Sequence, residues 1–227
     1  MTNAALGRVA AIIPAAGSGT RLGAVIPKAF VDLNGLSLLT RSALAMSALV
    51  DVVVVSVSEE FLNEARTHLS EIDTELHIVI GGADRQSSVA NGLAVVPQDV
   101  DVVLVHDAAR PLVPASVTRS VISAVRSGAQ AVIPVLPVAD TLKRVDLRGS
   151  VTETVDRTTL RRVQTPQGFS RAILDQAYAD PTHSATDDAG LVEAMGVTIE
   201  TVAGDELALK ITTEHDLTIA RLLERNA

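Results

Sequence analysis

The sequence predicts an α/β fold built on a doubly wound, mostly parallel sheet. Apolar runs short enough for buried strands alternate with stretches of helical spacing along the 227 residues, and no repeat or low-complexity linker interrupts them. Hydrophobic residues make up 47% of the chain and aromatic residues only 2%, so Val, Ile, Leu and Ala must fill the core. Such runs are typical of parallel strands covered by helices on both faces. We therefore expect a single domain over residues 1–227.

The predicted strands are continuous apolar runs, several of them closed by glycine or proline, at residues 9–13, 52–57, 77–80, 100–105 and 131–135, with late strands at 197–202 and 207–212. The predicted helices have apolar residues at three- and four-residue spacing, at residues 38–49, 61–69, 87–96, 116–127, 170–178, 186–195 and 213–223. We expect Ser116 to cap the fourth helix, Gly128 to end it, and Thr213 to cap the last one. Asp187 and Asp188 fall in the positive first turn of the helix at 186–195.

The alternation of strand and helix breaks between residues 138 and 164. Residues 140–145 and 151–157 both alternate between polar and apolar side chains, and 146–149 can turn between them, which predicts a β-hairpin. Both strands are highly polar on one face, so we expect the hairpin to project from the body as an inserted arm. Because isolated hairpins are marginally stable, we expect a second copy of the chain to cover it; an ordinary solvated excursion is the alternative.

The composition excludes several classes of function. A formal net charge of −8 disfavours a general nucleic-acid binder but allows a binder of small anions whose cations are clustered. The chain has no cysteine, which excludes disulfides, thiolate metal sites and cysteine nucleophiles, and its five histidines show no metal-ligand spacing. There is no signal-peptide pattern and no apolar segment of about 20 residues, so we expect a cytoplasmic protein without a membrane segment.

Residues 9–30, VAAIIPAAGSGTRLGAVIPKAF, carry the first candidate site. A buried strand leads into the small residues AAGSG at 15–19, whose backbone can approach a ligand closely and turn N–H groups towards it. Arg21 and Lys28 follow, seven residues apart, and Pro27 stiffens the chain before the second cation. Bare amides beside two fixed cations suit a polyphosphate whose charge shifts during a reaction.

The glycines of this loop do not by themselves distinguish a phosphate site from a tight connection after a first strand. A dinucleotide fingerprint requires a glycine where Leu22 stands, and the third glycine, Gly23, comes one place too late. An ATPase-type P-loop requires a Gly-Lys-Ser/Thr triplet, which is absent. It is the presence of Arg21 and Lys28 together that favours a phosphate site.

A second candidate site, HDAARP at 106–111, follows the strand predicted at 100–105. Asp107 stands just beyond that strand and Arg110 comes three residues later. The Asp107 carboxylate can hold Mg²⁺ against phosphates, since Mg²⁺ prefers one or two carboxylates plus substrate oxygens and water, and Arg110 can lie beside a second anion. The alternative is a purely structural pair of Asp107 and Arg110. We interpret His106 as a packing or hydrogen-bonding residue rather than a base.

Three stretches with unusual residues, 14–28, 81–88 and 106–111, each follow a predicted strand directly. In doubly wound sheets, ligands bind at the carboxyl ends of the strands. We therefore expect the three stretches to meet at one edge of the sheet.

Taken together, these motifs resemble the 2-C-methyl-D-erythritol 4-phosphate cytidylyltransferases, a family of the non-mevalonate isoprenoid pathway. The resemblance covers nearly the whole chain and rests on PAAGSGTRLG…PKAF, GGADRQSSVANGL, VHDAARP, DTLKR…VDR, QTPQGF, TDDA and LALKIT. HDAARP combined with GxGTR…PK is specific, whereas each motif alone would be weaker. The resemblance implies a Rossmann-like nucleotidyltransferase fold and a homodimer that transfers CMP from CTP to methylerythritol phosphate, with Mg²⁺ as cofactor and pyrophosphate as product.

The resemblance also implies roles for residues at matching positions. The catalytic cations would be Arg21, Lys28, Arg157 and Lys210. The nucleotide would be bound by Ala15, Ala16, Gly17, Gly19, Gly82, Ser88 and Asp107, of which Asp107 is also the metal ligand. The sugar phosphate would be bound by Arg110, Thr141, Arg157, Thr165, Thr186 and Lys210. Thr141 and Arg157 lie on the predicted arm, about 138–164, which in the family reaches into the neighbouring subunit's site.

Such a reaction needs no protein nucleophile, because the phosphate oxygen of the substrate itself attacks the α-phosphorus of CTP. Catalysis then rests on positioning and charge neutralisation, and no general base is required. Within the same class, the alternative is a cytidylyltransferase for another polyol phosphate, such as ribitol 5-phosphate. A non-catalytic nucleotide-binding regulator would be expected to lack Arg21, Lys28 or Asp107, and all three are present. The loop spacing disfavours a nicotinamide dehydrogenase.

Overall fold

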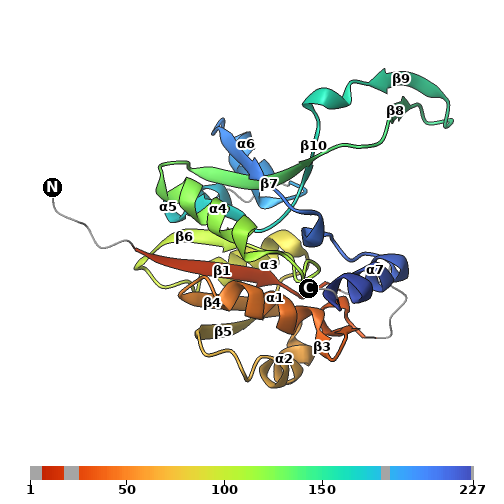
Figure 1. The fold of residues 1–227 in the computed structure, drawn as a ribbon. Coiled ribbons are helices and arrows are strands. Elements are labelled where there is room, and N and C mark those ends of the chain that lie inside the picture. The colour runs from red at the N-terminus through yellow and green to blue at the C-terminus, as the bar shows by residue number, and fades with distance from the viewer. Residues whose placement is uncertain (1–6, 18–25, 180–184, 226–227) are drawn as a thin grey trace.

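The computed structural model describes residues 7–17, 26–179 and 185–225, and its centre is one large sheet (Figure 1). The described chain forms an eight-stranded sheet of order β10-β7-β11-β6-β1-β4-β5, with β12 also paired to β7. The strands are β1 (Arg8–Pro14), β4 (Val52–Val57), β5 (Glu75–Ile80), β6 (Val100–Val105), β7 (Ala131–Pro137), β10 (Arg161–Val163), β11 (Gln167–Ser170) and β12 (Ile199–Ala203).

The sheet is mostly parallel, as the alternating sequence predicted. Strand β1 pairs in parallel with β4 and β6, β4 pairs with β5, and β7 pairs with β12. Strand β11 is antiparallel to its neighbours β6 and β7, and β10 is antiparallel to β7. Neither antiparallel strand was predicted, because residues 161–170 mix polar, glycine and proline residues without a continuous apolar run.

Helices cover both faces of the sheet (Figure 1). One face packs against α1 (Leu38–Ser47), α2 (Leu62–His68) and α4 (Ala115–Arg126), and the other against α3 (Arg85–Leu93), α5 (Arg171–Ala179) and α6 (Asp188–Ala194). A smaller apolar cluster joins α7 (Glu214–Glu224) to the two-stranded β2 (Asp32–Leu33) and β3 (Leu36–Ser37). Single 3₁₀ turns lie at Lys28–Phe30, Glu59–Phe61, Arg157–Thr159 and Glu206–Ala208. In the described part of the chain, none of the helices has the length and apolar character needed to span a membrane.

The helix ends agree with the sequence at two of three predicted positions. Thr213 caps α7 in a capping box with Asp216, and Gly128 follows α4 with a φ of 112°, a backbone conformation that favours glycine. The prediction of a Ser116 cap was wrong. Helix α4 begins at Ala115, and the residue before it, Pro114, has no side chain that can accept a hydrogen bond.

The prediction of a late strand at residues 207–212 was also wrong. Asp205 caps the 3₁₀ turn at Glu206–Ala208, and the segment then continues without strand pairing. The Ile211 amide instead donates to the carbonyl of Ala109 at 2.8 Å. The segment therefore runs beside the loop that follows β6, and not along an edge of the sheet.

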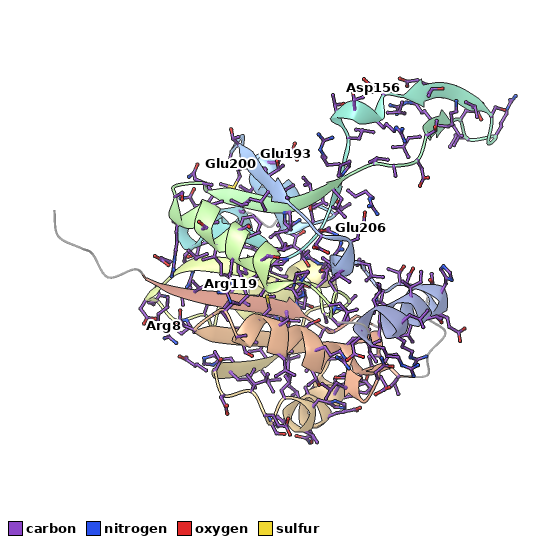
Figure 2. All side chains as sticks on the ribbon, viewed as in Figure 1. Arg8, Arg119, Asp156, Glu193, Glu200 and Glu206 are labelled. Atoms are coloured by element: carbon purple, nitrogen blue, oxygen red, sulfur yellow. The ribbon has the colours of Figure 1, made fainter. Side chains whose placement is uncertain are left out.

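The predicted hairpin consists of β8 (Leu142–Val145) and β9 (Val151–Val155), which pair only with each other among the described strands. It stands away from the sheet (Figure 1), and Figure 2 shows Asp156 on it and Glu206 on the body. The two parts are joined near β10, where Arg162 forms an ion pair of 2.7 Å with Glu206. Of the predicted segment 138–164, residues 161–163 form β10 in the large sheet, so we call residues 138–160 the arm.

Candidate active site

The main cavity of the candidate site lies at the carboxyl ends of β1, β5 and β6. It has a volume of about 260 Å³. Its lining comes from the three stretches that the sequence placed at this edge, together with Ala29 and Lys210: Pro14, Ala15, Ala16, Gly17, Lys28, Ala29, Gly82, Ala83, Asp84, Arg85, Ser88, Asp107, Ala108, Ala109 and Lys210. The predicted convergence is therefore confirmed for the described residues of these stretches, which leave out 18–25. We call this cavity the first cavity.

Two glycines after β5 allow the wall of the first cavity to close tightly. A Cβ atom on Gly81 would lie 2.6 Å from the Cβ of Ala16, and one on Gly82 would lie 2.4 Å from the Cβ of Ser87. The Gly82 amide donates to the Ser88 hydroxyl at 3.0 Å, and this hydroxyl donates to the Asp84 carbonyl. The loop is thus fixed against the start of α3, where the Asp84 carboxylate caps the helix and accepts a hydrogen bond from the Ser87 amide at 2.7 Å.

A second, smaller cavity adjoins the first. Its volume is about 130 Å³, and it shares Arg85, Asp107 and Lys210 with the first cavity. The rest of its lining is polar for the most part and comes from the segments that follow β6, β10 and α5: Arg110, Val163, Gln164, Thr165, Gln167, Thr186 and Asp187. Asp107 is the one carboxylate, among the described residues, that lines both cavities.

Asp107 is the centre of a cluster of cations. Its side chain is 11% exposed, and its Oδ2 lies 2.7 Å from the Lys210 ammonium and 3.9 Å from Nε of Arg110. Its Oδ1 lies 3.2 Å from Nε of Arg85. Burial opposes ionisation of Asp107, but the charges of Arg85, Lys210 and Arg110 outweigh it and hold the pKa of the carboxyl well below its ordinary value. Asp107 is therefore a carboxylate at neutral pH.

Arg110 is built into the wall of the second cavity. Its guanidinium donates to the carbonyls of Ala208 and Val163, at 2.6 and 3.2 Å. Its Nε is buried and makes no hydrogen bond within the described structure. A buried guanidinium nitrogen with an unused donor, beside a cavity, suits an anionic ligand.

His106 is fully buried and contacts two residues that line the second cavity. Its Nδ1 lies 3.1 Å from the Thr165 hydroxyl and its Nε2 lies 3.2 Å from the Arg110 carbonyl. The Thr165 hydroxyl also accepts a hydrogen bond from the Asp107 amide at 3.0 Å. Burial lowers the pKa of His106 to about 4, so the imidazole is neutral. It is a hydrogen-bonding residue, as the sequence indicated, and it links Thr165 to the loop that carries Asp107.

The sequence-predicted residues divide into three groups. The two cavities contain Ala15, Ala16, Gly17, Lys28, Gly82, Ser88, Asp107, Arg110, Thr165, Thr186 and Lys210. Thr141 and Arg157 are exposed on the arm and line neither cavity of the same chain. Gly19 and Arg21 lie outside the described residues.

Sequence reasoning missed Arg85, which lines both cavities and contacts Asp107 directly. Its guanidinium also forms an ion pair of 2.7 Å with Asp188, which is completely buried. The signal was present in GGADRQSS, where an arginine follows, three residues on, a glycine pair that comes after a predicted strand. Its partner could not be found from spacing, because Asp188 lies 103 residues away.

The fold and this site define an α/β nucleotidyltransferase. A glycine-closed loop, a cation cluster and a carboxylate meet at the carboxyl end of a mostly parallel sheet. The comparison with known proteins then gives the family. Residues 9–225 match the family model described as 2-C-methyl-D-erythritol 4-phosphate cytidylyltransferase, and the chain belongs to this family.

Individual relatives agree with this assignment. The chain is 52% identical over 219 residues to the 2-C-methyl-D-erythritol 4-phosphate cytidylyltransferase of Rhodococcus jostii, covering 96% of this chain and 95% of that protein. The crystal structure of the enzyme of that name from Thermus thermophilus is similar at 35% identity and a TM-score of 0.80, covering 96% and 99% of the two chains. A 4-diphosphocytidyl-2C-methyl-D-erythritol synthase from Anaerococcus prevotii has a TM-score of 0.83 at 26% identity, with 96% and 99% coverage.

Proposed function

We propose that the two adjoining cavities are where this chain performs the reaction of its family, the transfer of CMP from CTP to 2-C-methyl-D-erythritol 4-phosphate. A phosphate oxygen of the acceptor forms a bond to the α-phosphorus of CTP, and the bond from this phosphorus to the bridging oxygen of the β-phosphate breaks. Pyrophosphate leaves with the electron pair, and 4-diphosphocytidyl-2-C-methyl-D-erythritol remains. Membership of the family over residues 9–225 supports this assignment.

The first cavity suits CTP. Its glycine-closed wall offers close backbone approach for the nucleotide, and Lys28 adds a cation. Together with Arg21, which precedes it in the sequence motif, Lys28 would stabilise the charge that grows on the departing pyrophosphate. Removing one such preorganised donor costs about a hundredfold or more in rate.

The second cavity suits the phosphate of the acceptor. Arg110, Lys210 and Thr186 all line it, and the buried Nε of Arg110 has an unused donor. Since the two cavities meet at Asp107 and Lys210, a phosphate in the second cavity would lie next to the α-phosphate of a nucleotide in the first. An enzyme of this kind accelerates the reaction mainly by holding the two anions next to each other and neutralising their charge.

The residues at the junction fit a magnesium ion. Mg²⁺ is usually held by one or two carboxylates plus substrate phosphates and water, and Asp107 is an ionised carboxylate that faces both cavities. The described residues hold no cluster of three or more His, Cys, Asp or Glu side chains that could bind a metal on their own, which suits an ion carried in with the nucleotide. When bound, the ion would neutralise phosphate charge. We expect Asp107→Asn to weaken Mn²⁺ binding in the presence of CTP, measured by electron paramagnetic resonance.

We also propose that the arm completes the site of a second copy of the chain. Arg157 and Thr141 stand on the arm and line neither cavity of their own chain, and Leu147 at the hairpin turn is fully exposed. Mixing the inactive variants Arg21→Ala and Arg157→Ala tests this arrangement, because shared sites would restore part of the activity in mixed dimers. No recovery despite demonstrated subunit exchange would refute it.

The observation that carries the proposed function is the meeting of the two cavities at Asp107 in a chain of this family. The test is pyrophosphate release from CTP and Mg²⁺, with methylerythritol phosphate or ribitol 5-phosphate as the acceptor, and Lys28→Met as the impaired control. We expect release with the former alone. Release only with ribitol 5-phosphate would replace the acceptor and keep the mechanism. Release with neither, from a folded protein that binds CTP, would favour a regulator.

A further inference from the structure

A chain of three side chains leads from Asp107 into the interior of the protein. Arg85 at the start of α3 contacts Oδ1 of Asp107 through Nε and Oδ2 of Asp188 through Nη2, at 3.2 and 2.7 Å. The other oxygen of Asp188 accepts a hydrogen bond of 2.5 Å from the hydroxyl of Tyr178 on α5. The chain thus joins three helices, α3, α5 and α6, that lie on one face of the sheet (Figure 1).

Asp188 is an unusual residue to bury for stability alone. Its side chain is 0% exposed, and a buried ion pair contributes little compared with apolar residues of the same volume. Both of its oxygens have a partner, Arg85 at one and Tyr178 at the other. It lines neither the first nor the second cavity, but its side chain contacts Arg85, which lines both.

The two oxygens of Asp107 are held in different ways. At Oδ1, Arg85 is fixed from behind by Asp188, and the charges of Asp188 and Asp107 outweigh burial and raise its pKa above the ordinary value. At Oδ2, the nearest partner is Lys210, whose side chain is 43% exposed and can turn towards solvent or a ligand, while Nε of Arg110 lies farther away at 3.9 Å. The fixed partner at Oδ1 orients the carboxylate, and the exchangeable nearest partner at Oδ2 leaves room there for an incoming cation.

We propose that Asp188 and Tyr178 are positioning residues for the transfer reaction: they fix the Arg85 guanidinium, which in turn orients the Asp107 carboxylate between the two cavities. The inference rests on the proposed function, because Asp107 is taken to work at the reacting phosphates. Supporting residues of this kind change activity or metal affinity by about 10- to 100-fold when they are removed.

The kinetic test compares Tyr178→Phe and Asp188→Asn with Asp175→Asn. The control also removes the charge of an aspartate on α5 that pairs with an arginine, since Asp175 lies 2.8 Å from Arg171, but it is remote from both cavities. We expect kcat to fall about tenfold in Tyr178→Phe and further in Asp188→Asn, with KM for CTP and the acceptor nearly unchanged, and no change in the control. If Asp188→Asn does not fold, Tyr178→Phe decides alone.

A spectroscopic test follows from the composition, because Tyr178 is the only tyrosine of the chain. Replacement by 3-fluorotyrosine gives one ¹⁹F resonance, which should shift when CTP and Mg²⁺ bind at Asp107. An unmoved resonance at demonstrated CTP saturation would overturn the proposal. So would variants that lose only thermal stability, or that raise KM at constant kcat. If wild-type protein released no pyrophosphate, the proposed function would fail, independently of these comparisons.

Discussion

Replacing Asp107 by asparagine should lower both activity and stability, whereas replacing Lys210 by methionine should lower activity alone. The structure explains the difference. Without the Asp107 charge, Arg85 keeps its ion pair with Asp188, and Lys210 can reach water. Arg110 is left with a side chain only 10% exposed, with two carbonyl partners and no carboxylate within 4 Å among the described residues.

The expected loss of stability in Asp107→Asn follows from the number of buried cations that lose their partner. Removing one partner of a buried ion pair costs about 3–5 kcal/mol, and we expect the lower end, about 3 kcal/mol, since only one of the three cations is stranded. For a chain of this size each kcal/mol lowers Tm by about 2–4 °C, so Asp107→Asn should unfold about 6–12 °C below wild type. Lys210→Met removes a partly exposed cation and should cost less than about 1 kcal/mol.

The assay is urea unfolding and thermal unfolding without nucleotide or metal, so that ligand binding does not stabilise any variant. Glu153→Gln is the matched control, because it removes an exposed carboxylate that lies 2.8 Å from Arg144 on the arm. Pyrophosphate release should fall by about a hundredfold or more in Asp107→Asn and Lys210→Met. Equal stability of Asp107→Asn and wild type, or an equal loss in both variants, would refute the reasoning.

Three further predictions concern the histidine, the glycine loop and the arm. Burial and the charge of Arg110 outweigh the charge of Asp107 and lower the pKa of His106 from 6.5 to about 4. The unfolded chain therefore binds this proton at a higher pH than the folded chain. The free energy of unfolding should fall by about 3 kcal/mol as the pH drops from about 6.5 to about 4. Urea unfolding at several pH values should show a smaller slope in His106→Gln, and an unchanged slope would contradict this. Gly82→Ala places a Cβ 2.9 Å from the Ser87 carbonyl carbon and should weaken CTP binding about a hundredfold by calorimetry; wild-type affinity would show that the loop can move aside. Leu147→Asp should shift the proposed dimer towards monomer in sedimentation, because Leu147 at the hairpin turn is fully exposed in the single chain; an unchanged sedimentation coefficient would contradict a role of the turn in the interface.

Much of the fold could be predicted from the sequence because buried parallel strands are continuous apolar runs. The run at 52–57 is completely buried as β4, and the edge where residues 14–17 lie beside residues 107–109 follows from the direction of parallel strands. The prediction of a strand at 207–212 was wrong for a related reason: the segment has apolar residues, but it packs beside the loop after β6 and pairs with no strand. Apolar character alone does not say whether a segment pairs with a strand or packs on a loop.

The arrangement of the charges could not be predicted in the same way. A sequence shows that Asp187 and Asp188 fall in the first turn of a helix, where both would complement the helix dipole. In the structure Asp187 does cap α6, but Asp188 turns inward to Arg85 and Tyr178. Which of two adjacent carboxylates is buried depends on the packing of α3 and α5 against α6, and this packing is tertiary information.

The charges of the site explain how an acidic protein keeps a cation cluster ready for two anions. The chain carries a net charge of −8, yet Arg85, Arg110 and Lys210 all lie within 4 Å of the Asp107 carboxylate. Without a counterion these cations would repel one another and open the site. Asp107 supplies that counterion before substrates bind, and in the proposed reaction the phosphates take over this role. The same carboxylate can then face the proposed metal ion, because Lys210 releases Oδ2 when it turns to a phosphate.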